Sequence, residues 1–198
     1  MSDADYYETH AEAFVAATIG ADMSALRHRF LSALPPSRTG PVRILDAGSG
    51  SGRDARAFRE AGFAVSAFDA SAAMVAATRA HAGIPARQLR FEDFVWEHPF
   101  EGIWACASLL HVARDDLLPV IARLARHLVP EGMLYISFKS GTQMRIKDGR
   151  RFTDMTTDDL AQMLNDCGDL GPPEIWETRD CRPDRGAETW VNALVSRR

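Results

Sequence analysis

The sequence predicts an α/β fold, in which one doubly wound sheet of about seven strands is covered by helices on both faces. Apolar runs alternate with helical segments along the chain, which indicates a mostly parallel sheet. The runs are nearly continuous, as in Val42-Arg43-Ile44-Leu45, and strands buried on both faces have this character. We expect strands near residues 42–46, 64–69, 87–91, 101–107, 133–138, 174–179 and 188–195, with helices near 53–61, 71–82, 115–128 and 157–167.

Length and charge narrow the class of protein. The 198 residues, 46% of them hydrophobic, suit a single domain. The 23 basic and 27 acidic residues give a net charge of −4, which disfavours a nucleic acid partner, because binding to phosphates normally requires a basic surface. No apolar run approaches the length of a membrane span, and the acidic start is unlike a signal peptide. We therefore expect a soluble cytoplasmic protein without a membrane partner, either a monomer or a homodimer.

Cysteine usage argues against a metal site. Cys106, Cys167 and Cys181 are odd in number and lack Cys-x-x-Cys spacing. The sequence therefore predicts reduced thiols, with neither a disulfide framework nor bound metal.

The most informative segment is an apolar strand that ends at Asp46 and leads into three alternating glycines. Gly48, Gly50 and Gly52 can adopt positive φ and let the backbone approach a ligand, and the helix that follows offers unpaired N–H groups to an anion. The nicotinamide fingerprint Gly-x-Gly-x-x-Gly is spaced differently, and no carboxylate leads it. The segment predicts a nucleotide-type cofactor and disfavours an NAD(P)-dependent oxidoreductase.

A second acid lies where a ribose would need it. The next strand ends in Asp69, about 20 residues beyond the first glycine, the offset at which an acid accepts hydrogen bonds from both ribose hydroxyls. The alternative is that Asp69 only caps the following helix, although Ser71 is an equally good cap.

Together these segments resemble class I S-adenosylmethionine-dependent methyltransferases of the small-molecule type. The run from Asp46 to Gly52 resembles the first motif of that family, and 69–74 resembles the second. Three more matches follow at 88–94, 100–112 and 128–138, so the likeness is strongest between Val42 and Lys139.

The resemblance implies a Rossmann-like sheet whose last strand inserts antiparallel, with S-adenosylmethionine as cofactor and S-adenosylhomocysteine as product. It divides the chain into an N-terminal helical lid at 1–40, a cofactor-binding core at 41–140 and a substrate-side part at 141–198. In the family, the methionine matching Met74 packs near the adenine, the acid matching Asp93 accepts the adenine amino hydrogen, and the aromatic matching Phe94 covers the ring. The carbonyl matching Ala107 lies near the ammonium of the cofactor. The cofactor-binding residues expected are thus Tyr6, Asp46, Gly48, Gly50, Gly52, Arg53, Asp69, Ala70, Met74, Asp93, Phe94 and Ala107.

Two of these residues carry open alternatives. Arg53 lies in the first helical turn after the glycines, where the helix dipole opposes a cation, so it needs a partner: either Asp54 or the carboxylate of the cofactor. The Gly-Arg-Asp triplet here resembles the tellurite-resistance and thiopurine branches of the family. Tyr6 belongs to amphipathic segments in residues 3–34, which either pack on the domain or form the lid.

Methyl transfer depends mainly on alignment, since orientation supplies more acceleration than a general base. The best candidate base is His111, just past the fourth strand, although it could instead pack against the next helix. Two arginine-rich loops, with Arg150, Arg151 and Arg182 as the substrate candidates, either converge on an anionic acceptor or pair with nearby aspartates. A non-catalytic S-adenosylmethionine-binding or interaction domain is the remaining alternative to an enzyme.

Overall fold

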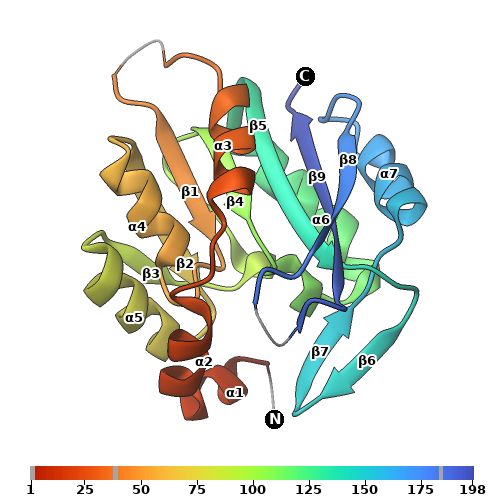
Figure 1. The fold of residues 1–198 in the computed structure, drawn as a ribbon. Coiled ribbons are helices and arrows are strands. Elements are labelled where there is room, and N and C mark those ends of the chain that lie inside the picture. Colours follow the sequence, from red (N-terminus) through yellow and green to blue (C-terminus); the bar gives the residue numbers. More distant parts are fainter. Residues whose placement is uncertain (1–2, 38–39, 183–184) are drawn as a thin grey trace.

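The computed structural model describes residues 3–37, 40–182 and 185–198, and this part of the chain forms a seven-stranded sheet and a separate hairpin (Figure 1). The strands of the large sheet lie in the order β3 (Ala86–Gln88), β2 (Ala64–Asp69), β1 (Arg43–Ala47), β4 (Phe100–Ala105), β5 (Leu128–Lys139), β9 (Thr189–Ser196) and β8 (Glu174–Arg179). β9 is antiparallel to both of its neighbours, and the other six strands run parallel. The predicted doubly wound sheet, with its antiparallel last strand, is confirmed.

Helices cover both faces of this sheet. One face carries α3 (Ser24–Ala33), α4 (Arg53–Glu60) and α5 (Ala72–Ala82), and the other carries α6 (Arg114–Arg126) and α7 (Thr157–Asp166). The four helices that follow β1 lie close to the predicted bounds.

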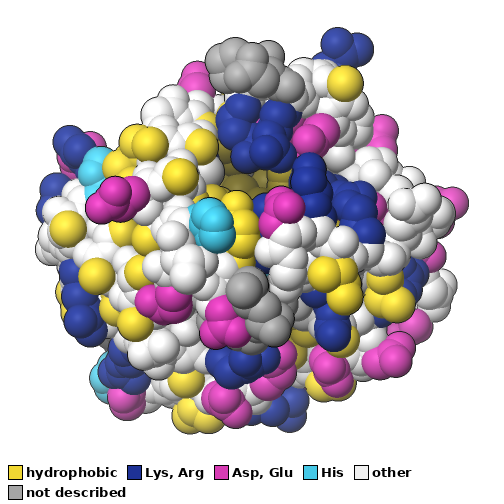
Figure 2. Space-filling model, turned by 90° about the horizontal axis from the view of Figure 1, so that it is seen from below, with side chains coloured by type: hydrophobic (Ala, Val, Ile, Leu, Met, Phe, Trp, Pro, Cys, Tyr) yellow, Lys and Arg dark blue, Asp and Glu magenta, His cyan; other side chains and the backbone are white. Residues whose placement is uncertain are grey.

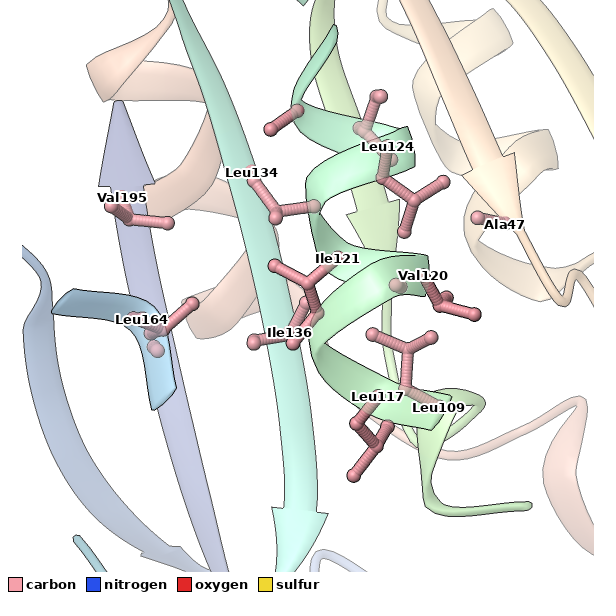
Figure 3. Close-up of a cluster of buried hydrophobic side chains, with 14 of the residues drawn as sticks. Ala47, Leu109, Leu117, Val120, Ile121, Leu124, Leu134, Ile136, Leu164 and Val195 are labelled. Atoms are coloured by element: carbon pink, nitrogen blue, oxygen red, sulfur yellow. The ribbon is translucent and has the colours of Figure 1, made fainter. Parts of the chain in front are cut away.

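The α6 face holds the largest apolar cluster. Leu117, Val120, Ile121 and Leu124 recur at the spacing of one helical face and belong to one buried cluster with Leu134 and Ile136 of β5 (Figure 3). All six side chains are buried. The sequence therefore forms α6 as an amphipathic helix, and burial of its apolar stripe fixes it to the strands that lead to the site.

The opposite face is closed by aromatic packing. Phe30 of α3 has no exposed surface, and its ring centroid lies 5.7 Å from that of Phe58 and 5.2 Å from that of Trp104. Trp104 also stacks on Tyr135, with centroids 4.0 Å apart. These contacts hold α3 firmly against the centre of the sheet.

Two short N-terminal helices occupy a different place. α1 (Asp3–Thr9) and α2 (Ala11–Thr18) lie at the edge where the parallel strands end, rather than on a face (Figure 1). No residue of α2 is fully buried. Only part of the amphipathic N-terminal segment therefore packs on the sheet, and the rest lies across its carboxyl edge.

A hairpin replaces the first of the two expected arginine-rich loops. β6 (Met144–Lys147) and β7 (Arg150–Thr153) pair antiparallel, joined by Asp148 and Gly149, whose φ angles are 53° and 76°. Two consecutive positive φ angles define the tight turn that Asp-Gly favours. The hairpin follows β5 and extends past the carboxyl edge, close to α1 (Figure 1).

None of the helices in the described part of the chain combines the length and the apolar composition needed to span a lipid bilayer.

Candidate active site

The glycine loop lies between β1 and α4, and its backbone is left-handed at all three glycines. The φ angles are 76° at Gly48, 53° at Gly50 and 75° at Gly52. A Cβ on Gly48 would lie 2.4 Å from the Cβ of Ser108, and one on Gly52 would lie 2.7 Å from the Cα of Thr78. Side chains are therefore excluded here by both conformation and space. The positive φ angles that the sequence predicted are confirmed.

Asp69 ends β2 beside this loop. Its Oδ2 accepts the N–H of Gly50 at 2.9 Å, and its Oδ1 accepts the N–H of Ser71 at 3.0 Å. Burial raises the pKa of Asp69, while the backbone hydrogen bonds act in the opposite direction. Ser71, not Asp69, caps α5, because its hydroxyl accepts the N–H of Met74. The capping alternative for Asp69 is thus wrong, and its carboxylate remains beside the loop with unused lone pairs.

Other predicted cofactor residues near Asp69 have mixed exposure. Ala70 is partly exposed, and its carbonyl accepts a hydrogen bond from the Gln88 side chain at 3.2 Å. Met74 is 1% exposed and belongs to the core. Asp93 is exposed at the end of a short 3-10 helix, Phe91–Asp93.

Phe94 does not lie where the sequence placed it. Its ring has no exposed surface and packs 5.2 Å from Phe68 and 4.7 Å from His127, between centroids. The 3-10 helix ends at Asp93, and the extended backbone that follows directs Phe94 into the core. The aromatic beside the loop is instead Phe91, whose Cε2 would lie 3.6 Å from a Cβ on Gly48.

Asp46 lies behind the glycine loop. It is 3% exposed, and its Oδ2 accepts the N–H of Ala55 in the first turn of α4 at 3.0 Å. Burial, and next the negative charge of Asp54, raise the pKa of Asp46 well above its ordinary range. The carboxyl group therefore supports the start of α4.

Asp54 is the partner that Arg53 requires. Arg53 donates to both carboxylate oxygens of Asp54, at 3.1 and 2.6 Å, and a third donor reaches the carbonyl of Thr18 at 3.3 Å. Asp54 also accepts from Arg27 at 2.7 Å and from the indole of Trp104 at 3.1 Å. Burial acts to raise the pKa of Asp54, but the charges and hydrogen bonds of Arg53 and Arg27 hold it below its ordinary value. Of the two alternatives for Arg53, the structure contains the contact with Asp54.

Ala107 follows β4 with a φ of 52°, unusual for a residue with a side chain. Its N–H donates to the Ser137 hydroxyl at 2.8 Å, and that hydroxyl donates to the Cys106 sulfur at 3.8 Å. Burial raises the pKa of the Cys106 thiol to about 12, so it stays protonated near neutral pH. The turn that carries the Ala107 carbonyl is thus fixed from β5.

His111 joins three elements at this edge. Its Nδ1 lies 2.7 Å from the carbonyl oxygen of Arg151, and its Nε2 lies 2.9 Å from the Tyr7 hydroxyl. A carbonyl only accepts, so Nδ1 carries the proton in this contact, and in the neutral imidazole Nε2 then accepts from Tyr7. The ring also packs edge-on against Phe152, with centroids 5.2 Å apart. His111 therefore presents its basic nitrogen toward α1.

The N-terminal helices cover the loop. The ring of Phe14 would lie 3.3 Å from a Cβ on Gly50, and Glu8 accepts the Ser71 hydroxyl at 2.9 Å. Tyr6, expected at the cofactor, instead lies under Arg150, whose Cζ is 3.8 Å from the ring centroid. Sequence reasoning missed Tyr7, Glu8 and Phe14 because amphipathic spacing indicates a helix but not the surface it meets.

Several arginines of the two basic segments pair with aspartates. Arg182 meets Asp180 at 2.5 Å and Arg145 meets Asp154 at 2.6 Å. Arg151 is exposed on the hairpin. Figure 2 looks onto this edge and shows a hollow with apolar side chains at its base and Lys and Arg side chains along its margin.

The fold and this edge define a class: an α/β protein that holds a nucleotide-type cofactor where its parallel strands end. Residues 44–132 match the family described as methyltransferase domain. Comparison with curated protein sequences gives no significant match.

Several solved structures share the fold. The 1,6-didemethyltoxoflavin-N1-methyltransferase of Burkholderia thailandensis, solved with S-adenosylhomocysteine, is 22% identical with a TM-score of 0.76, and the match covers 98% of this chain and 84% of that one. DhpI in complex with SAH is 20% identical with a TM-score of 0.70, over 98% and 95% of the two chains. Magnesium protoporphyrin IX methyltransferase of Synechocystis PCC 6803, with bound SAM, is 14% identical with a TM-score of 0.69, again over 98% and 95%.

Residues 44–132 therefore match a methyltransferase domain, and the chain has the fold of solved methyltransferases that hold S-adenosylhomocysteine or S-adenosylmethionine. The residues present fit such a cofactor, since bare glycine backbone and a carboxylate adjoin at the loop.

Replacing Asp46 with asparagine tests the buried acid behind the loop. A raised pKa in the folded protein means that this group's stabilising contribution is present below the unfolded pKa of about 3.8 and is lost as pH rises through the folded pKa. We therefore expect the urea midpoint of Asp46→Asn, relative to the unsubstituted protein, to increase between about pH 4 and pH 7. An offset that is constant with pH would contradict this, and Glu12→Gln, on the exposed surface of α2, is the control.

Proposed function

We propose that this enzyme binds S-adenosylmethionine over the glycine loop and transfers its methyl group to a small molecule held between α1 and the β6–β7 hairpin. The observation that carries the proposal is the meeting, at one edge of the sheet, of bare backbone at Gly48 and Gly50, the carboxylate of Asp69 and the basic nitrogen of His111. When bound, the cofactor supplies a methyl group already activated by its sulfonium.

Three residues hold the cofactor in this proposal. Asp69 accepts hydrogen bonds from the ribose, Asp93 accepts one from the adenine amino group, and the Ala107 carbonyl faces the ammonium. Asp69 is supported by its place beside Gly50, and Ala107 by the strained turn that fixes its carbonyl.

Other predicted cofactor residues take supporting roles. Asp46 and Arg53 hold the start of α4, because their polar atoms bond to Ala55 and Asp54. Met74 and Phe94 pack beneath the site from the core. Tyr6 belongs to the lid formed by α1, within the segment 1–40, while 41–140 carries the cofactor and 141–198 faces the acceptor.

His111 acts as general base on the acceptor. Its Nδ1 proton is held by the Arg151 carbonyl, which directs Nε2 toward the Tyr7 hydroxyl and the proposed acceptor site. The rest of the site aligns the acceptor with the methyl group and excludes water. α1 excludes water by covering the edge.

A small-molecule acceptor is supported by charge and by similar enzymes. The net charge of −4 disfavours nucleic acid. The enzyme of similar fold from Burkholderia thailandensis has 1,6-didemethyltoxoflavin bound. The proposal includes a monomer or homodimer in the cytoplasm, where the free thiols of Cys106, Cys167 and Cys181 would persist.

Formation of S-adenosylhomocysteine in fractionated cell extract tests the acceptor class. We expect product only with the small-metabolite fraction, and none with purified total RNA, DNA or protein as acceptor. Product with any of the macromolecular fractions would overturn the acceptor assignment.

Asp69→Ala removes the carboxylate proposed to hold the ribose. Loss of charge-assisted hydrogen bonds should weaken S-adenosylhomocysteine binding roughly tenfold to hundredfold in titration calorimetry. Glu92→Ala, an exposed acid close to the site, should bind as before. A loss of less than about threefold would show that Asp69 does not hold the cofactor.

His111→Ala removes the proposed base without touching the glycine loop. Turnover should fall by roughly 10²- to 10⁴-fold, while the dissociation constant for S-adenosylhomocysteine stays the same. His98→Ala, at an exposed histidine remote from this edge, is the matched control. Full turnover in the His111 variant would remove the residue from the mechanism.

A further inference from the structure

Cations and aromatic rings alternate along the acceptor side of the edge. The Cζ of Arg150 lies 3.8 Å from the Tyr6 ring centroid and 5.2 Å from that of Phe152. Beyond Phe152, the Nζ of Lys139 lies 5.8 Å from the same ring and 5.6 Å from that of Trp190. We call these five residues the cation–aromatic row. It draws on α1, β7, β5 and β9, so the fold brings it together from distant parts of the sequence.

Arg150 is paired less closely with an acid than several other cations at this edge. Lys139 is in contact with Glu188, Arg145 with Asp154 and Arg182 with Asp180. The nearest acid to Arg150 is Asp148 at 3.6 Å, and the side chain of that aspartate is 57% exposed.

The Arg150 side chain is itself only 15% exposed. Its Nε is buried and has no hydrogen-bond partner in the described part of the chain. A guanidinium that is largely removed from water, with one ion pair to an exposed carboxylate and an unsatisfied N–H donor, is costly, because desolvation disfavours the charge. An anionic ligand group would remove both costs, since the planar fork of arginine matches a carboxylate in bidentate fashion.

The same ring connects Arg150 with the proposed base. The His111 ring centroid lies 5.2 Å from that of Phe152, as does the Cζ of Arg150. Both groups therefore adjoin the Phe152 ring, so a single small molecule can reach Arg150 with an anionic group and His111 with its nucleophile.

We propose that Arg150 binds the anionic group of the methyl acceptor and that the acceptor is an aromatic acid whose ring lies against the cation–aromatic row. This rests on the proposed function and narrows it, because neither Arg151 nor Arg182 is assigned to the substrate. The Tyr6 ring lies between Arg150 and His10, whose ring stacks on it with centroids 4.3 Å apart, whereas Trp190 is partly exposed and offers a face on which a planar ring can stack.

Binding of defined probes to the protein saturated with S-adenosylhomocysteine tests this inference. The probes are para-hydroxybenzoate, its neutral amide para-hydroxybenzamide, and the saturated analogue hydroxycyclohexane carboxylate. We expect the aromatic acid to bind at least about tenfold more tightly than either analogue in titration calorimetry. In Arg150→Gln the preference for acid over amide should vanish, and in Arg150→Lys it should be reduced, since a point charge replaces the fork.

Lys147→Gln is the matched control, because it removes the same charge from an exposed position opposite Arg150 on the hairpin and should keep the preference. Equal binding of acid and amide, no detectable binding of the acid, or a preference that survives Arg150→Gln would overturn the role of Arg150. Equal binding of the aromatic and saturated acids would overturn the aromatic assignment.

The two proposals fail in different measurements. S-adenosylhomocysteine binding is measured first, without probe, and its absence would contradict the proposed cofactor site. Normal S-adenosylhomocysteine binding in Arg150→Gln shows that this variant is folded, so a loss of the acid preference in it reports on Arg150 itself. If the unsubstituted protein binds S-adenosylhomocysteine but shows no preference for the acid, only the further inference is contradicted.

Discussion

The carboxyl edge depends on the close approach of the glycine loop to β4 and α5. At Gly48 the backbone meets Ser108, and at Gly52 it meets Thr78, at distances that leave no room for a Cβ. Hydrogen bonds fasten the same contacts, since Ser108 donates to the Ala47 carbonyl at 2.7 Å and the hydroxyls of Ser49 and Thr78 lie 2.8 Å apart. Asp69 takes its position from the loop through Gly50, so a change in the loop backbone would displace the acid as well.

Much of this arrangement could be predicted from the sequence. Continuous apolar runs locate buried strands, and glycines at alternate positions after a strand leave few conformations other than a tight left-handed loop. Local sequence signals also exist for the hairpin. Asp148-Gly149 is a strong turn signal, but the arginine-rich composition around it favours a loop, so composition alone does not predict the hairpin that forms.

Contacts between distant segments were beyond sequence reasoning. Phe91 and Phe94 both flank Asp93, and only the 3-10 helix decides which ring lies by the loop and which enters the core. Arginine partners depend on the same long-range geometry. The sequence shows that Arg53 needs an acid. That Asp54 accepts hydrogen bonds from Arg27, Arg53 and Trp104 together is seen only in the folded structure.

The firm attachment of α3 restricts how the edge can be uncovered. Phe30 buries this helix against Trp104, and the neighbouring Arg29 lies 3.6 Å above the Trp176 ring. By contrast, α2 contributes no fully buried residue. Any departure of the first two helices must therefore pivot within residues 19–23, around Gly20, where nothing would obstruct a side chain. Ligand entry and exit would then proceed by rotation of a small tethered unit, with the sheet and its flanking helices left intact.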